Sequence, residues 1–157
     1  MRNSRKNPYR WPDRVEDREW YEQLPIVTAG FSVSGFTLDP DACTRAFGLA
    51  PTEIGIRGKK RTPESISRLK LSYWVIDSEE VEVDDVESVL WKVVERVWPA
   101  RDRIAAFAAS NPSLFVSFYA SVYMCRGQEP IYGLSWKIMR KMAKFKVKYG
   151  LNVCDYS

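Results

Sequence analysis

The segment that most constrains the fold is an alternating stretch that runs directly into a capped helix. Apolar residues at positions 29, 31 and 33 alternate with Gly and Ser, which predicts a strand with one buried face. Asp39 is a typical helix N-cap residue, and Pro40 suits the first helical position because its missing N–H costs nothing there. Gly48 predicts the helix end, and Pro51 prevents the helix from resuming. The chain therefore combines strands and helices from its first folded segment.

Further strands are predicted from the same period of two. Alternation returns near residues 69–75, and the strongest strand pattern covers residues 114–123. Residues 151–156 predict a closing strand. A short partner strand is also expected near Ile131, after a turn over residues 127–130.

Helical patterns lie between these strands. Asp84 is the expected N-cap of a helix that breaks at Pro99, and a short alanine-rich helix follows to about Ala109. A last helix is predicted from Ser135 to about Tyr149. The core stripe of the first of these helices is Val86, Val89, Leu90, Val93 and Val97. Because helices and strands recur without strict alternation, we expect an α+β fold, a mostly antiparallel sheet with helices packed on one face.

Length and composition favour one folded domain with an extension. The chain has 157 residues, 45% of them apolar, which is enough for a single core. Residues 1–25 are predicted to form a basic N-terminal extension, and residues 26–157 a single α+β domain. The longest apolar run, residues 104–109, is far too short to span a bilayer, and no signal peptide is recognisable. We therefore expect a cytoplasmic protein without membrane contact.

Residue types that usually carry catalysis are scarce. The chain has no histidine, which removes the commonest general base and the commonest metal ligand. Its three cysteines, Cys43, Cys125 and Cys154, are too far apart for a zinc or redox motif. We therefore expect a protein that is not an enzyme and uses no cofactor or metal.

Several short motifs together resemble a known family. The motifs are the run Gly35-x-x-Leu-Asp-Pro-Asp, the run Phe47-Gly-Leu-Ala-Pro-Thr, Gly58, Trp74, Pro99 and the closing pair Asp155-Tyr156. In combination they resemble the bacterial domain-of-unknown-function family 4279, over about residues 26–156. The chain departs from that pattern at Phe47, where leucine is more usual, and in an acidic insertion near residues 77–87. The resemblance implies an α+β fold and transfers no catalytic residue.

Acidic residues are concentrated in one run. Seven of the 20 acids lie between residues 77 and 87. Asp84, Asp85 and Glu87 are also suited to the N-terminus of the following helix, where the helix dipole favours negative charge. The run lacks glycine and ordered ligand spacing, so it does not predict a calcium site. A negative surface of this kind is able to dock onto a basic partner.

We therefore hypothesise a non-enzymatic bacterial protein of the immunity or antitoxin type, which neutralises a toxin by direct protein–protein contact. The predicted contact residues are the acids of this run and two tryptophans of the helix that follows it: Asp77, Glu79, Glu80, Glu82, Asp85, Trp91 and Trp98.

The alternative hypothesis is nucleic-acid binding through the N-terminal extension and the last predicted helix. On that helix four lysines follow 4-3-4 spacing and would form one stripe: Lys137, Lys141, Lys144 and Lys148. A solvated helix face explains the same pattern. A core stripe is predicted at Ile138, Met142, Phe145 and Tyr149. A third stripe, Trp136, Met139, Ala143 and Val147, lies either between two layers or against a partner.

Overall fold

The structure is a computed structural model, and it describes residues 24–124 and 128–155. The predicted extension over residues 1–25 therefore lies almost wholly outside the described residues. The strands are β1 (Ile26–Gly35), β2 (Glu53–Gly55), β3 (Ser72–Asp77), β4 (Val81–Glu82), β5 (Phe115–Met124) and β6 (Lys148–Asp155). The helices are α1 (Pro40–Phe47), α2 (Val86–Val97), the 3-10 turn η3 (Trp98–Ala100), α3 (Arg101–Ser110) and α4 (Trp136–Ala143). Among these described residues, no helix is long and apolar enough to cross a membrane.

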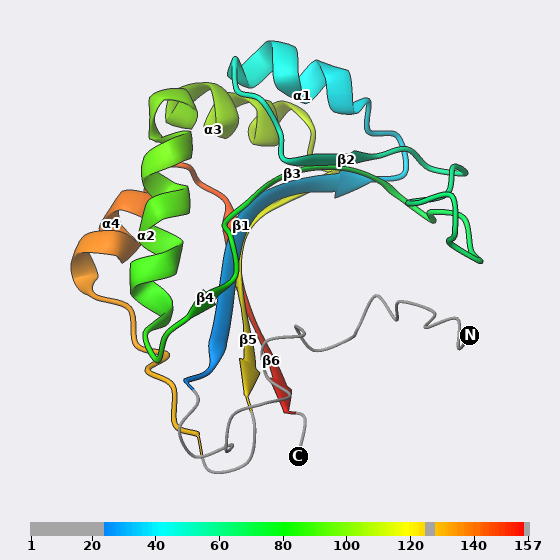
Figure 1. Cartoon of the computed structure of the whole chain (residues 1–157). Coiled ribbons are helices and arrows are strands. Elements are labelled where there is room, and N and C mark those ends of the chain that lie inside the picture. Colours follow the sequence, from blue (N-terminus) through cyan, green and yellow to red (C-terminus); the bar gives the residue numbers. More distant parts are fainter. Residues whose placement is uncertain (1–23, 125–127, 156–157) are drawn as a thin grey trace, which may run out of the picture.

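The strands form one mixed sheet in the order β2-β3-β1-β5-β6, with β4 pairing the start of β1 beside β3. All pairings among the described strands are antiparallel except β5 with β6, which run parallel and are connected through α4. The sheet is strongly bent, and the helices cover one of its faces (Figure 1). The expected α+β fold, with a mostly antiparallel sheet and helices on one face, is confirmed.

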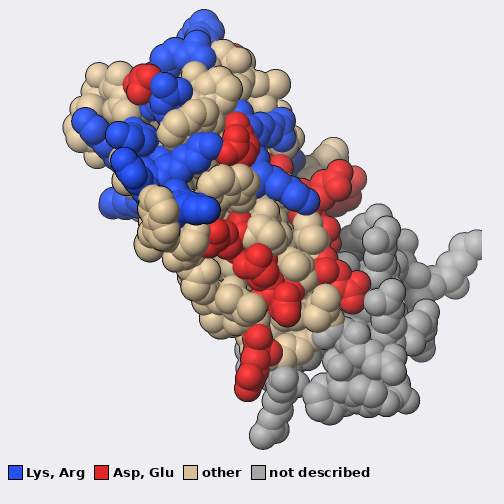
Figure 2. Space-filling model, turned by 90° about the vertical axis from the view of Figure 1, so that its left-hand side faces the viewer, with Lys and Arg blue, Asp and Glu red and all other residues tan. Residues whose placement is uncertain are grey.

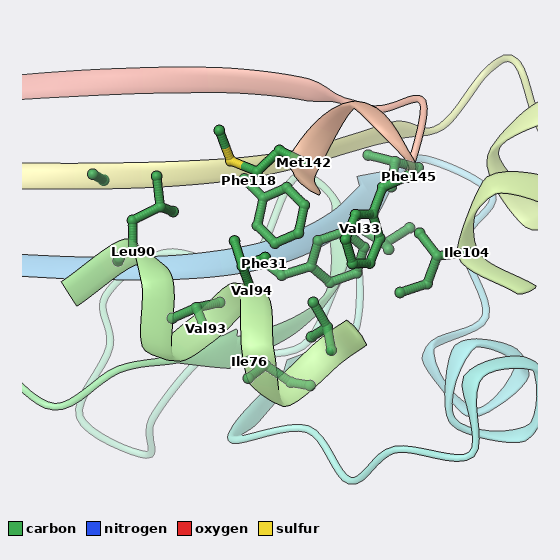
Figure 3. Close-up of a cluster of buried hydrophobic side chains, with 14 of the residues drawn as sticks. Phe31, Val33, Ile76, Leu90, Val93, Val94, Ile104, Phe118, Met142 and Phe145 are labelled. Carbon is green, nitrogen blue, oxygen red and sulfur yellow. The ribbon is translucent and has the colours of Figure 1, made fainter. Parts of the chain in front are cut away.

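An aromatic cluster fills the space between sheet and helices. Phe31 of β1 contacts Trp74 of β3 and Phe118 of β5, with ring centroids 6.3 and 5.2 Å apart. Phe145, just after α4, packs edge-on against Phe118 with centroids 5.0 Å apart. Figure 3 shows Phe31, Phe118 and Phe145 together with Leu90 from α2. Burying each such ring contributes about 1.5–3 kcal/mol to the free energy of unfolding, and this cluster joins both layers.

Local capping signals place α1 and α2. The Asp39 carboxylate accepts from the Asp41 N–H, and Gly48 ends α1 with φ 65° in the left-handed region, as predicted. For α2 the N-cap is Asp85, one residue after the expected Asp84. The predicted core stripe of α2 is confirmed, because all five of its residues are buried. Strand β5 lies within one residue of its prediction, whereas β3 begins at Ser72 rather than near residue 69.

The predicted last helix is wrong in its second half. Helix α4 ends at Ala143, and residues 148–150 belong to strand β6 instead. Lys146 adopts φ 55°, a left-handed conformation that ends any right-handed helix. Beyond it, eight residues of β6 pair with β5, from Ser117↔Lys148 to Met124↔Asp155. This pairing provides hydrogen bonds for backbone N–H and C=O groups that a longer helix would have paired internally.

The stripes of α4 are only partly as expected. Ile138, Met142 and Phe145 are buried, but Tyr149 lies on β6 and is exposed. Trp136 and Met139 remain 63% and 49% exposed. Helix α4 is therefore not enclosed between two layers and presents these two side chains at the surface.

Candidate functional site

The sheet face opposite the helices is polar. Side chains of β1 and β5 alternate, so Phe31, Val33 and Phe118 face the helices, whereas serines and tyrosines, among them Ser32, Ser117 and Tyr119, face away. The hydroxyls of Ser32 and Ser117 lie 3.4 Å apart across this face. On β6, Asn152 reaches Ser121 at 3.5 Å. This polar face is where chemistry-bearing side chains come together.

Asp77, the last residue of β3, lies on the polar face beside a tyrosine. Its carboxylate accepts a hydrogen bond from the Tyr119 hydroxyl of β5, across the intervening strand β1. Gly30 of β1 makes this contact sterically accessible. A Cβ atom there would clash with the Tyr119 ring and would lie 2.6 Å from Asp77 Oδ1. The backbone N–H of Asp77 donates to Thr52 Oγ1 at 2.9 Å. Asp77 is therefore held against the polar face by contacts within the sheet.

The surroundings of Asp77 favour its protonated form. Burial, reinforced by the negative charge of Glu53, raises the pKa of Asp77 from its ordinary 3.8 to about 6, while Arg61 opposes the shift. A carboxyl with this pKa changes its charge just below neutral pH.

A second group adjoins Asp77 on the same face. Arg61 donates to both carboxylate oxygens of Glu53, at 2.8 and 2.9 Å, and the Tyr73 hydroxyl also donates to Glu53. The hydrogen bonds from Arg61 hold the pKa of Glu53 below its usual value, and burial raises the pKa of Tyr73 to about 12. We call Glu53, Arg61, Tyr73, Asp77 and Tyr119 the polar-face cluster. Each of its charged groups already has a partner inside it.

The acids after β3 have a different character. Glu79 and Glu80 lie in the loop between β3 and β4, Glu82 lies on β4, and all three side chains are exposed. Within the described part of the chain, the carboxylates of Glu79 and Glu80 make no hydrogen bond or ion pair. We call Glu79, Glu80 and Glu82 the acidic edge, because β4 borders β1 on the side away from β5.

The acids at the start of α2 have internal partners. The Asp85 carboxylate caps α2 by accepting from the N–H groups of Glu87 and Ser88, at 3.0 and 3.2 Å. Glu87 accepts from the Ser135 hydroxyl at 2.6 Å and so ties α2 to the start of α4. Asp85 therefore has a helix-capping role, and the acidic run divides into an inward part and an exposed part.

The two predicted contact tryptophans surround a lysine. The Nζ atom of Lys141 lies 5.3 Å from the Trp91 ring and 4.5 Å from the Trp98 ring, and it donates to the Glu95 carboxylate. Arg101 stacks on Trp98 as well, at 4.7 Å. Two predicted partner-binding residues, Trp91 and Trp98, thus contact Lys141, a predicted nucleic-acid-binding residue, and the lysine charge is paired with Glu95.

Three of the four lysines predicted as one stripe lie on α4 or at its C-cap, and the fourth does not. Lys137 is exposed on α4 and Lys144 is exposed just after it, whereas Lys141 is partly buried. Lys148 lies on β6, with its Nζ 5.0 Å from the Phe115 ring, so its assignment to the last helix was wrong. Figure 2 shows basic residues gathered over the upper part of the helix-covered side and acidic residues below them.

Sequence reasoning missed four members of the polar-face cluster, Glu53, Arg61, Tyr73 and Tyr119. One signal was present, because a glycine inside a strand, such as Gly30, marks a close approach by another group. Among residues 24–124 and 128–155, no group of three or more Cys, Asp or Glu side chains is arranged to hold a metal ion.

A single bent sheet with helices on one face and paired titratable groups on the other defines a small two-layer α+β domain. The chain belongs to the family described as Domain of unknown function (DUF4279), whose profile matches residues 25–156. The resemblance carried by the glycine, proline and tryptophan motifs is thereby confirmed. No curated protein gives a significant match to the chain, and no solved structure does.

Proposed function

We propose that this protein is a non-enzymatic bacterial binding protein of the immunity or antitoxin type, acting in the cytoplasm without a cofactor. It neutralises a protein partner by covering the partner's basic active surface. The observation that carries this proposal is the acidic edge, Glu79, Glu80 and Glu82, exposed together along one border of the sheet.

The acidic edge is suited to docking because its position is held by the sheet while its carboxylates face solvent. Val81 and Glu82 pair with Val27 and Ile26 of β1, and the Ser78 hydroxyl donates to the backbone oxygen of Glu79 at 2.9 Å. Exposed carboxylates on such a support attract a basic partner during encounter and reject acidic ones. The other predicted contact residues, Asp77, Asp85, Trp91 and Trp98, also make the internal contacts described above, so the proposal rests on the acidic edge.

The test is growth rescue in a bacterial host that expresses the product of the neighbouring gene. We expect the wild-type chain to restore growth and Glu79→Lys/Glu80→Lys to fail. The control is Glu64→Lys/Asp102→Lys, which makes the same change in net charge at exposed residues away from this loop. Equal rescue by both double variants would remove the acidic edge from the proposal.

A second candidate function is nucleic-acid binding at α4. It is favoured by the exposed Trp136 ring beside the exposed cations Lys137, Arg140 and Lys144. An aromatic ring next to lysines is a platform on which a base stacks while the cations contact phosphates. Binding to a single-stranded oligonucleotide should then weaken steeply with salt and be lost in Trp136→Ala. Binding that is insensitive to salt would exclude this function.

A further inference from the structure

Strand β6 forms the second border of the sheet. It pairs with β5 along its whole length, and no strand among the described residues pairs with its other side. An eight-residue border strand presents a row of unpaired backbone N–H and C=O groups, which is a template for another strand.

The usual protections of such a border are missing from β6. Proteins block exposed strands with prolines, bulges or inward-pointing charges. Residues 148–155 contain no proline, their pairing with β5 is continuous, and their only charged residues, Lys148 and Asp155, stand at the two ends. On the side that faces the helix layer, Tyr149, Leu151 and Val153 are 37%, 38% and 50% exposed.

We propose that β6 is the interface of a homodimer, in which the β6 strands of two copies pair antiparallel. Residues opposite one another in such a pair point to the same face of the sheet. With the twofold axis at Leu151, this residue meets the partner's Leu151, and Tyr149 meets the partner's Val153. The apolar row is therefore complementary to itself, and the two sheets join into one.

Charge favours the same arrangement over a parallel one. Each β6 begins beside Lys146 and Lys148 and ends at Asp155. Antiparallel pairing brings the basic start of one strand next to the acidic end of the other, twice in the dimer. A parallel pair would place like charges side by side, which is unfavourable.

Helix α4 widens the contact. Its residues Met142 and Phe145 pack over Phe118 of β5, on the β6 side of the helix layer (Figure 3). In the joined sheet the two β5 strands are three strand spacings apart, roughly 14 Å. The two α4 helices, each above its own β5, would be separated by a similar distance. Helices in direct contact lie roughly 8–10 Å apart, so large side chains are needed to fill the space between these two helices. Trp136 and Met139 are large exposed side chains on this helix.

The dimer is independent of the proposed toxin contact. The acidic edge borders the sheet on the side away from β6, so it stays exposed on both copies. Loss of dimerisation and loss of partner capture are therefore separate results.

The experiment measures the mass of the full chain by light scattering, under reducing conditions, across a wide range of concentrations. We expect twice the chain mass of 18.2 kDa for the wild type. Leu151→Lys and Val153→Lys should each be monomeric, because a charge would then stand in the apolar row. The matched control is Ile54→Lys, an exposed apolar residue on the opposite border strand β2, which should remain dimeric.

Melting curves show which variants are folded. If Leu151→Lys does not fold, the result for Val153→Lys decides the test, because Val153 is the more exposed residue. A wild-type chain that is monomeric at every concentration overturns the proposal. So does a folded Val153→Lys variant that stays dimeric. In a monomeric wild type, protection from hydrogen exchange of the β6 amides that point away from β5 would show that another part of the chain occupies this border, which also overturns the proposal.

Discussion

Asp77 is the residue whose protonation links the structure to pH. Its folded pKa of about 6 lies above its ordinary 3.8, so the folded chain holds the proton more tightly than the unfolded chain does. The contribution of Asp77 to stability is therefore favourable at low pH, falls as pH rises from about 4 to about 6, and stays at its low value above that. We predict that Asp77→Asn gains stability relative to wild type over this range, measured as the difference in melting temperature.

The matched control is Asp102→Asn, because Asp102 is highly exposed on α3. Its difference from wild type should stay nearly constant between pH 4 and pH 7. If the Asp77→Asn difference is equally flat, or falls as pH rises, the half-buried carboxyl does not have the environment described here.

Gly30 is the residue that permits the Asp77–Tyr119 contact. Gly30→Ala places a methyl group against the Tyr119 ring and Asp77 Oδ1, so we predict a loss of about 1–3 kcal/mol in the free energy of unfolding. Gly150→Ala is the control, since Gly150 pairs with the same tyrosine from β6 but has open space at its Cβ position. Denaturant unfolding of the two variants should separate them clearly. Similar stabilities would mean that the Tyr119 ring does not lie over Gly30.

Part of the candidate site was predictable at this scale. The run of acids between residues 77 and 87 is visible in the sequence, and Glu79, Glu80 and Glu82 are exposed as a contact surface requires. The contacts of Asp77 with Tyr119 and Glu53 were not predictable, because these residues are distant in sequence and meet only in the sheet. The contact of Trp91 and Trp98 with Lys141 was not predictable either, because it depends on how α4 packs on α2.

At the scale of elements, the turn from α4 into β6 carries the main structural correction. Residues 135–149 have a helical period throughout, yet the chain leaves the helix after Ala143. The turn requires φ 55° at Lys146, which costs a residue with a Cβ roughly 1–2 kcal/mol. Eight residues of parallel pairing with β5 outweigh that cost.

Replacing Lys146 by glycine should relieve this strain. We predict that Lys146→Gly raises the free energy of unfolding by about 0.5–1 kcal/mol, after allowing for the larger entropy of glycine in the unfolded chain. Lys144→Gly should lower it by about the same amount, because Lys144 has ordinary right-handed angles. Urea unfolding measures both. A loss of stability in Lys146→Gly would contradict the left-handed turn.

Helices marked by capping residues or a buried stripe were predictable from the sequence. Element boundaries that depend on pairing with a distant strand were not. Helix α1 carries its own cap and stop at Asp39 and Gly48, and α2 carries an unbroken buried stripe, so both were placed within a residue or two. The start of β3 and the end of α4 depend on which distant strand pairs with them. Such long-range pairing leaves little trace in local periodicity.

At the scale of the whole molecule, the sheet is bordered by β2 and β4 on one side and by β6 on the other. The border formed by β4 carries exposed carboxylates, which discourage strand addition and favour a basic partner. The border formed by β6 is apolar on one face and uncharged along its middle, which favours a second copy of the chain. The two proposed contacts therefore lie on different sides of the sheet and would not compete.

The central claim is that the acidic edge binds a basic protein partner. The most direct test is the affinity of a purified candidate partner, the product of the neighbouring gene, for three forms of the full chain. We predict that Glu79→Lys/Glu80→Lys binds at least roughly tenfold more weakly than wild type, because apposed like charges cost several kcal/mol. We predict that the charge-matched control Glu64→Lys/Asp102→Lys binds as wild type does. Equal affinities for all three forms, each with an unchanged melting curve, would contradict the claim.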